Sequence, residues 1–207
     1  MSFKDRGYCI QKQIIDKQFA DFLYSYLQLK KKVFYTLSDM NLISPYNLDW
    51  GGKGDSMCPD TFAIYGDAAM DNLIVFLKKK VEKQTKLELI ESYSYARLYK
   101  KGDDLRKHRD RKECAVSLTL NLGGDKWPIF LLDKKGIQTD ITLKPGDALL
   151  YQGTDLPHWR EKFKGNACGQ LFLHYTLSNA NVIYDSRKHI GLPNSATEKK
   201  RQFNESI

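Results

Sequence analysis

The sequence contains no long hydrophobic run. Its longest apolar stretches, residues 73–77 and 171–173, are far shorter than the roughly 20 residues that a membrane-spanning helix needs. Residues 1–5 contain nothing like the apolar core of a signal peptide. We therefore expect a cytoplasmic protein with no membrane partner.

Cysteine is also scarce. The four cysteines are far apart in the sequence and form no Cys-X-X-Cys pair: Cys9, Cys58, Cys114 and Cys168. This spacing argues against a sequence-local zinc site, and a disulfide framework is not expected in a cytosolic chain of this size. We predict that all four are buried free thiols.

Acidic residues are outnumbered by basic ones. The chain has 33 Lys and Arg against 25 Asp and Glu, a net charge of +8. Such an excess can favour an anionic partner, including nucleic acid. The basic residues are scattered, however, and their clusters lie at the ends of apolar-periodic segments or in the tail: residues 30–32, 78–80 and 199–201. We favour solvated helix ends, where lysine complements the helix dipole, over a nucleic-acid groove.

A chain of 207 residues fits one domain, for which we expect three parts. Residues 1–86 should hold helices and an irregular loop. Helical spacing predicts a helix over 11–34, with Asp16 as N-cap and the lysine run at its end, and another over 67–84, capped by Asp67. Between them, turn signals in 35–66 predict a long loop or a set of short elements, and 42–65 could be a substrate lid.

From Leu87 onward the apolar period changes from helical to alternating. Alternating segments predict at least six strands: residues 87–99, 116–122, 129–132, 141–143, 148–151 and 170–177. Turn signals separate them, and no helical pattern intervenes, so an antiparallel sandwich or barrel is expected over 87–179. Residues 180–207 are polar and read as a tail that packs through a few apolar side chains: Val182, Ile183, Tyr184 and Ile190.

One group of residues carries candidate chemistry. In an extended segment, residues two apart point to the same side, so His108 and Asp110 can face one ion while Arg109 points away. His158 follows a later strand and a short turn, and a chain wound round a small barrel could return it to that pair. Two neutral imidazoles and one carboxylate form the facial triad that holds non-haem Fe(II) and leaves other positions open.

Two longer motifs surround these residues. Residues 97–110 read Arg-Leu-Tyr-Lys-Lys-Gly-Asp-Asp-Leu-Arg-Lys-His-Arg-Asp, and residues 144–153 read Lys-Pro-Gly-Asp-Ala-Leu-Leu-Tyr-Gln-Gly, followed by His158-Trp-Arg-Glu. Over residues 87–177 the chain resembles the Fe(II)/2-oxoglutarate dioxygenases of the prolyl-4-hydroxylase and alkylated-DNA-repair type. The resemblance implies a mainly β protein with N-terminal helices: a double-stranded β-helix, or jelly-roll and cupin-like barrel, with helices packed on its outer face.

The resemblance also implies an activity and a site. Fe(II) would be held by His108, Asp110 and His158, and 2-oxoglutarate would chelate the iron. The enzyme would use O₂ to hydroxylate a C–H bond of its substrate and release succinate and CO₂. In this family a tyrosine shortly before the first metal histidine faces the co-substrate, and Tyr99 occupies that place.

The sequence departs from the family at one position. Members usually carry an Arg or Lys on the strand after the distal histidine, to pair with the C5 carboxylate of 2-oxoglutarate, and residues 167–175 contain neither. We choose Arg160 instead, because its fork binds a carboxylate in two contacts and it shares a side with His158. Arg97 and Lys164 are the alternatives. Thr119 and Asn121 could donate hydrogen bonds to the same ligand, and Gln170 is a weaker candidate.

Neighbouring residues are open to plainer interpretations. His174, in an apolar strand, is expected to be a satisfied core histidine or to support the metal ligands indirectly. Trp127 and Trp159 could each form a pocket wall or fill the core. Tyr93 and Tyr95 are expected to pack rather than to stack on substrate.

The sequence leaves the substrate open among a peptide, an amino acid and a nucleotide. Oxidative demethylation of alkylated nucleic acid is one alternative function. It is weakly favoured by the net charge of +8. A cupin-like barrel that binds metal or a small ligand without turnover is another, although such a barrel needs no carboxylate clamp.

Overall fold

The structure is a computed structural model that describes residues 3–180, 187 and 189–196. Its helices are α1 (Phe3–Arg6), α2 (Lys17–Asp39), α3 (Ala68–Thr85) and the short 3-10 helices η1 (Lys112–Cys114) and η2 (Asn194–Ala196). Its strands are β1 (Tyr8–Gln11), β2 (Gly52–Gly54), β3 (Pro59–Tyr65), β4 (Leu89–Lys100), β5 (Leu105–His108), β6 (Val116–Gly124), β7 (Ile129–Leu132), β8 (Gln138–Ile141), β9 (Ala148–Tyr151), β10 (His158–Arg160) and β11 (Ala167–Leu177). None of the described helices combines the length and the apolar character needed to span a membrane.

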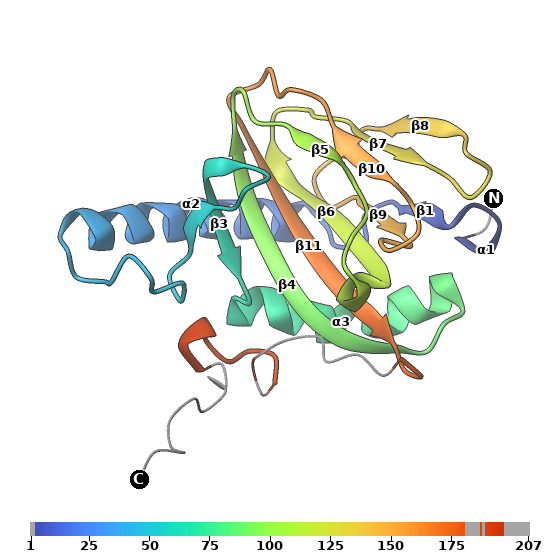
Figure 1. Ribbon diagram of the computed structural model, residues 1–207, viewed down its shortest axis with the longest axis horizontal. Coiled ribbons are helices and arrows are strands. Elements are labelled where there is room, and N and C mark those ends of the chain that lie inside the picture. Colours follow the sequence, from blue (N-terminus) through green and yellow to red (C-terminus); the bar gives the residue numbers. More distant parts are fainter. Residues whose placement is uncertain (1–2, 181–186, 188, 197–207) are drawn as a thin grey trace, which may run out of the picture.

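The strands form two antiparallel sheets. The large sheet has the order β1-β9-β6-β11-β4-β3-β2, and the small sheet has the order β5-β10-β7-β8. Helices α2 and α3 cover the outer face of the large sheet, and the small sheet lies across its other face (Figure 1). Because successive strand residues point to opposite faces, each long strand of the large sheet packs on the helices with one set of side chains and faces the small sheet with the other.

The main core lies between the large sheet and the two long helices. Leu118 and Leu120 of β6 and Leu171 of β11 are fully buried there against Leu27 of α2 and Leu77 of α3. A smaller core between the two sheets contains side chains from β1, β7, β8 and β9. The intervening residues of β4, β6 and β11 therefore point into the space between the sheets, where polar groups are concentrated.

The N-terminal part differs from the expectation in several places. Asp16 and Asp67 do cap the two long helices, but α2 extends beyond the predicted end. The lysine clusters 30–32 and 78–80 lie within α2 and α3 rather than at their ends, because lysine is a good helix former and gives no stop signal. Residues 8–11 and parts of 35–66 are strands of the large sheet, so helices do not all precede the β core.

The C-terminal segment is anchored through one buried ion pair. Arg187 donates from Nη1 to Asp71 Oδ2 of α3 over 2.7 Å, and both side chains are almost fully buried. Ile190, one of the four residues predicted to pack the tail, is half-buried. The other three, Val182, Ile183 and Tyr184, lie outside the described residues, as does the basic cluster 199–201.

Candidate metal centre and its cavity

The fold brings the three predicted metal ligands together. Strands β5 and β10 are antiparallel neighbours, with His108 directly opposite His158. Asp110 Oδ1 lies 3.6 Å from His108 Nε2 and 3.4 Å from His158 Nε2. Among the described residues, this is the one group of three potential ligand atoms that lie within 4.8 Å of one another.

Backbone contacts fix the orientation of both imidazoles. His108 Nδ1 donates to the Arg106 carbonyl at 2.8 Å, and His158 Nδ1 donates to the Leu156 carbonyl at 2.9 Å. A carbonyl oxygen only accepts, so Nδ1 carries the proton and Nε2 faces the carboxylate. A hydrogen-bonded Nδ1 with Nε2 turned toward the site is the usual arrangement of a metal-binding histidine.

Asp110 is held as firmly as the imidazoles. Ser117 donates from Oγ to Asp110 Oδ2 over 2.7 Å, and the Asp110 amide donates to the Gly153 carbonyl over 2.8 Å. A Cβ at Gly153 would lie 2.3 Å from Asp110 Oδ2, so only glycine allows this approach. The glycine was part of the sequence motif, but its role depends on a contact between distant segments.

The electrostatics of the triad favour a cation. Burial opposes ionisation of Asp110, but hydrogen bonds from His108 and His158 outweigh it and hold the pKa of this carboxyl well below its usual value. The same contact helps to raise the pKa of His108 although burial opposes it. A divalent cation held between the two Nε2 atoms and Asp110 Oδ1 would neutralise this carboxylate.

His174 supports the centre indirectly, as the sequence suggested. Its Nδ1 lies 2.9 Å from Ser117 Oγ, and because Ser117 donates to Asp110, His174 Nδ1 donates to Ser117. Burial lowers the pKa of His174 to about 4, so the ring is neutral near pH 7. A chain of hydrogen bonds therefore runs from His174 through Ser117 to Asp110.

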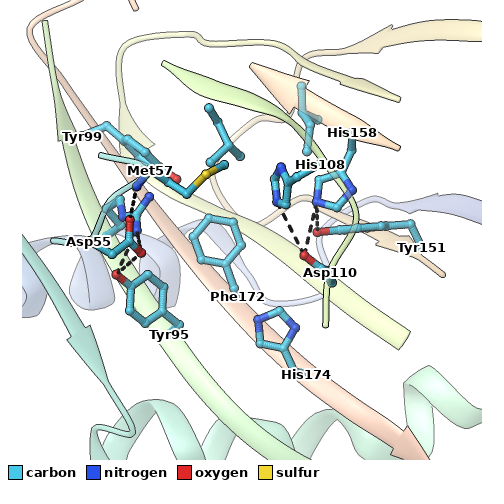
Figure 2. Close-up of a pocket in the computed structure, with 13 residues that line it drawn as sticks. Asp55, Met57, Tyr95, Tyr99, His108, Asp110, Tyr151, His158, Phe172 and His174 are labelled. Carbon is cyan, nitrogen blue, oxygen red and sulfur yellow. Dashed lines mark hydrogen bonds and ion pairs between the residues drawn. The ribbon is translucent and has the colours of Figure 1, made fainter. Parts of the chain in front are cut away.

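The triad opens into a cavity of about 170 Å³ between the sheets (Figure 2). Its lining consists of Asp55, Met57, Tyr95, Arg97, Tyr99, Leu105, His108, Asp110, Ile129, Tyr151, His158, Phe172 and His174. In Figure 2 Phe172 lies between the triad on one side and Asp55 and Tyr95 on the other. The cavity thus has a metal end, an apolar middle and a second polar group near Asp55.

Tyr99 and Arg160 lie close together, and each is a buried side chain with an unpartnered hydrogen-bond donor in the described part of the chain. Tyr99 is fully buried, and its hydroxyl has no hydrogen-bond partner among the described residues. Burial raises the pKa of Tyr99, so the phenol stays protonated and remains a donor. Tyr99 packs edge-on against Trp127 at 4.7 Å, and the Arg160 guanidinium lies 4.9 Å from the centre of the same ring.

Arg160 is a buried cation without an acidic partner in the described part of the chain. It donates from Nη1 to the Trp127 carbonyl and from Nη2 to Gln170 Oε1 at 3.2 Å, while its Nε has no partner. Burial lowers the pKa of Arg160. Arg160 is not among the residues that line the cavity, but Tyr99, which is, interacts with it.

The alternative basic residues have different surroundings. Arg97 lines the cavity and already pairs with Asp55, whereas Lys164 is exposed between β10 and β11. Asn121 donates to the Leu143 carbonyl, and Thr119 donates to the Tyr151 hydroxyl. These two contacts leave both side chains less available to a ligand than the sequence suggested.

The two tryptophans take different places, and neither lines the cavity. Trp127 is core, 5% exposed, beneath Tyr99. Trp159 stacks on Phe130 outside the cavity. Of the two tyrosines expected to pack, Tyr93 is buried against Tyr65, and Tyr95 packs against Phe172 while it also lines the cavity.

Sequence reasoning missed several cavity residues. The Tyr151 hydroxyl lies 3.4 Å from His158 Nε2, although Tyr151 appeared only as part of a strand. Asp55 and Met57, on the turn between β2 and β3, line the cavity, so the segment considered as a lid does reach the site. The alternation of the large sheet could have identified Phe172, which shares a face with His174.

All four predicted thiols are free, and three are buried while Cys9 is half-buried.

Solved structures of other proteins share this fold, although the chain matches no known family by sequence. No family model matches the chain, and no curated protein sequence does. Among solved structures, a prolyl-4-hydroxylase from Pseudomonas putida superposes with a TM-score of 0.63 at 14% identity, over 86% of this chain and 96% of that one.

Two further similar structures are complexes with 2-oxoglutarate. HygX from Streptomyces hygroscopicus, with nickel and 2-oxoglutarate bound, has a TM-score of 0.56 at 13% identity, over 85% of each chain. The collagen prolyl hydroxylase of Paramecium Bursaria Chlorella virus-1, in its 2OG complex, has a TM-score of 0.57 at 10% identity, over 83% of this chain and 97% of that one. At these identities the likeness concerns the fold, and the expected double-stranded β-helix with helices on its outer face is confirmed.

Proposed function

We propose that this protein is an Fe(II)- and 2-oxoglutarate-dependent dioxygenase, prolyl-hydroxylase-like in architecture, that hydroxylates a C–H bond of its substrate. One observation carries the proposal: two complementary half-sites lie together, because Tyr99 lines the same cavity as the triad and interacts with the buried Arg160. The first is the triad, whose two Nε2 atoms and carboxylate converge within 4.8 Å. The second is the pair of Tyr99 and Arg160, a buried phenol and a buried guanidinium that lack an anion.

The donor set fits Fe(II). His108, Asp110 and His158 supply two imidazoles and one carboxylate, the combination that holds iron with positions open for other ligands. Bound iron would supply O₂ activation and C–H oxidation, coupled to conversion of 2-oxoglutarate and O₂ to succinate and CO₂. The chain's part is to orient both Nε2 atoms through backbone carbonyls and to fix Asp110 through Ser117.

The second half-site fits the C5 carboxylate of 2-oxoglutarate. A guanidinium buried without an anion is costly, and a bound carboxylate would remove that cost. Arg160 Nε and the Tyr99 hydroxyl are the unpartnered donors that such a carboxylate would engage. This arrangement supports Arg160 over Lys164, which is exposed, and over Arg97, which is already paired with Asp55.

The alternative functions have less support. The net charge of +8 favours nucleic acid, but lysine clusters 30–32 and 78–80 lie on α2 and α3, across the large sheet from the cavity. A barrel that only bound metal would have no use for a buried cation without an acid. Both alternatives still make distinct experimental predictions.

The direct test is succinate release followed by NMR with Fe(II), 2-oxoglutarate, O₂ and cell extract as the source of substrate. Wild-type protein should release succinate and add one oxygen atom to an extract component detectable by mass spectrometry. His108→Ala and Asp110→Ala should abolish both signals. His189→Ala is the matched control, because His189 is exposed and outside the cavity, and it should behave as wild type.

Three outcomes separate the hypotheses. Binding of 2-oxoglutarate without decarboxylation across many extracts would support the non-catalytic barrel. Binding to single-stranded nucleic acid that weakens steeply with salt would support the demethylase. Equal succinate release by wild type and His108→Ala would rule out the proposed metal site.

A further inference from the structure

The cavity contains a second arginine whose surroundings differ from those of Arg160. Arg97 lies on β4, its side chain is 3% exposed, and it is the one Lys or Arg among the residues that line the cavity. Its guanidinium lies 5.1 Å from the centre of the Tyr95 ring and 5.3 Å from that of Tyr99, so two phenol rings fix its position. Its Nε has no hydrogen-bond partner in the part of the chain that the structure describes.

Arg97 is paired with the carboxylate of Asp55, which lies on the turn between β2 and β3. Arg97 donates from Nη2 to Asp55 Oδ2 at 2.5 Å, and the Tyr95 hydroxyl donates to the same oxygen at 3.3 Å. The Asp55 side chain is 48% exposed. Asp55 Oδ1 is used separately, since it accepts from the amides of Met57 and Cys58 and so shapes the turn.

The two ends of this ion pair therefore differ in how easily they can separate. Hydrated Asp55 can exchange Arg97 for water at little cost, as exposed ion pairs generally can. Arg97 is buried and needs another anion in place of Asp55. The position of Asp55 Oδ2 also shows that Arg97 and Tyr95 can both donate hydrogen bonds to one carboxylate oxygen at the cavity.

We infer that Arg97 and Tyr95 form the substrate-anchoring subsite of the cavity, and that they bind a carboxylate of the substrate at the position that Asp55 takes in the structure. The inference rests on the proposed function, in which 2-oxoglutarate occupies Arg160 and Tyr99. Phe172 lies between this subsite and the triad in Figure 2, and the apolar side chains of Met57 and Ile129 also line the cavity. The substrate class is therefore a carboxylate attached to an apolar body, whose far end reaches the metal.

The test measures ligand binding rather than turnover. The protein is loaded with Zn(II), which is redox-inert, and saturated with 2-oxoglutarate. Three probes of one shape are then titrated by calorimetry: 3-phenylpropionate, 3-phenylpropan-1-ol and 3-phenylpropylamine. The wild type should bind the carboxylate more tightly than the alcohol, and the alcohol more tightly than the amine.

Two cavity variants should move this preference in opposite directions. Asp55→Asn keeps an oxygen for the Met57 and Cys58 amides but removes the competing charge, so the carboxylate should bind about tenfold more tightly. Arg97→Gln should bind the carboxylate at least tenfold more weakly and no better than the alcohol. Lys135→Gln removes an equal charge from an exposed turn between β7 and β8, outside the cavity, and should leave the preference unchanged.

Failure of this inference can be told apart from failure of the proposed function. Both Arg97→Gln and wild type should bind 2-oxoglutarate equally. If Arg97→Gln loses 2-oxoglutarate, Arg97 is the co-substrate clamp and the subsite assignment is overturned. Equal or absent binding of all three probes, or preference for the amine through Asp55, also overturns it. If wild type with Zn(II) does not bind 2-oxoglutarate, the proposed function fails and the inference fails with it.

Discussion

Ser117 connects the triad to the interior of the large sheet. Its hydroxyl donates to Asp110 and accepts from His174, so it orients a proposed metal ligand without reaching the metal itself. Ser117→Ala should weaken Zn(II) binding about 10- to 100-fold, the usual effect of losing such an orienting contact. Metal titration against a chelator measures this.

Strand β4, which β11 separates from β6 in the large sheet, offers the control. Ser92 is also buried on β4, and its hydroxyl has no hydrogen-bond partner in the described part of the chain. Ser92→Ala should leave Zn(II) affinity unchanged. An equal loss in both variants would mean that the effect comes from general destabilisation rather than from Asp110.

Arg160 gives the prediction on which the co-substrate assignment depends. Arg160→Gln removes the proposed partner of the C5 carboxylate and should weaken 2-oxoglutarate binding about tenfold or more, because charge-assisted pairs of this kind are strong. Zn(II) binding should be retained. Calorimetry with Zn(II)-loaded protein measures both affinities, and Lys164→Gln is the exposed basic control. Unchanged affinity in Arg160→Gln would transfer the role to Arg97 or Lys164.

His174 predicts how stability depends on pH. Burial lowers its pKa from 6.5 to about 4, so the unfolded chain binds a proton that the folded chain excludes between these values. Its contribution to stability is complete above pH 6.5 and is lost as pH falls toward 4, by about 3 kcal/mol in total. Urea unfolding of metal-free protein should show a smaller loss for His174→Asn, whose amide can still donate to Ser117. Identical profiles for variant and wild type would contradict this account.

At the scale of elements, the start of α3 is tied to α2 through one carboxylate. Asp67 accepts from the amides of Ala69 and Met70 as N-cap, and also from the Tyr26 hydroxyl at 2.9 Å and from Lys30 at 3.1 Å. These contacts fix the angle at which the two helices support β4 and β6, and thereby the cavity wall.

The two N-caps can be compared directly. Asp67→Ala should lower the free energy of unfolding by about 2–3 kcal/mol, since the cap and a buried hydrogen bond are lost together. Asp16→Ala removes a cap with one bond, to the Phe19 amide, and should cost about 1 kcal/mol. Chemical unfolding of both variants measures the difference, and equal losses would mean that the contacts with α2 contribute nothing.

At the scale of the whole molecule, the β core of residues 87–179 packs against strands and helices from residues 1–86. β1 pairs with β9, β3 pairs with β4, and α2 and α3 cover the leucines of β6 and β11. A fragment of residues 87–179 would expose that apolar face, so it should be unfolded or aggregated by circular dichroism and light scattering. A chain ending after residue 196 keeps the pair of Arg187 and Asp71 and should fold. A folded fragment 87–179 would show that the barrel is independent.

The sequence alone predicted most of the secondary structure and the three residues of the triad. The change of apolar period at Leu87, the two N-caps and the motif around His108 and His158 predicted helices, strands and the three residues of the triad. The helices and strands follow from side-chain periodicity and short-range hydrogen bonding, which a single sequence reports directly, whereas the triad was predicted from its motif and from the resemblance to a known family.

The tertiary structure decided the remainder. Only the pairing of β5 with β10 sets His108 opposite His158, and only the packing of the β2–β3 turn against β4 brings Asp55 to Arg97. The isolation of Arg160 from any described acid likewise depends on what folds around it. Such contacts join residues far apart in the chain, and their energies depend on burial, which no local pattern contains. The sequence therefore determined which groups could do chemistry, and the fold decided which of them meet.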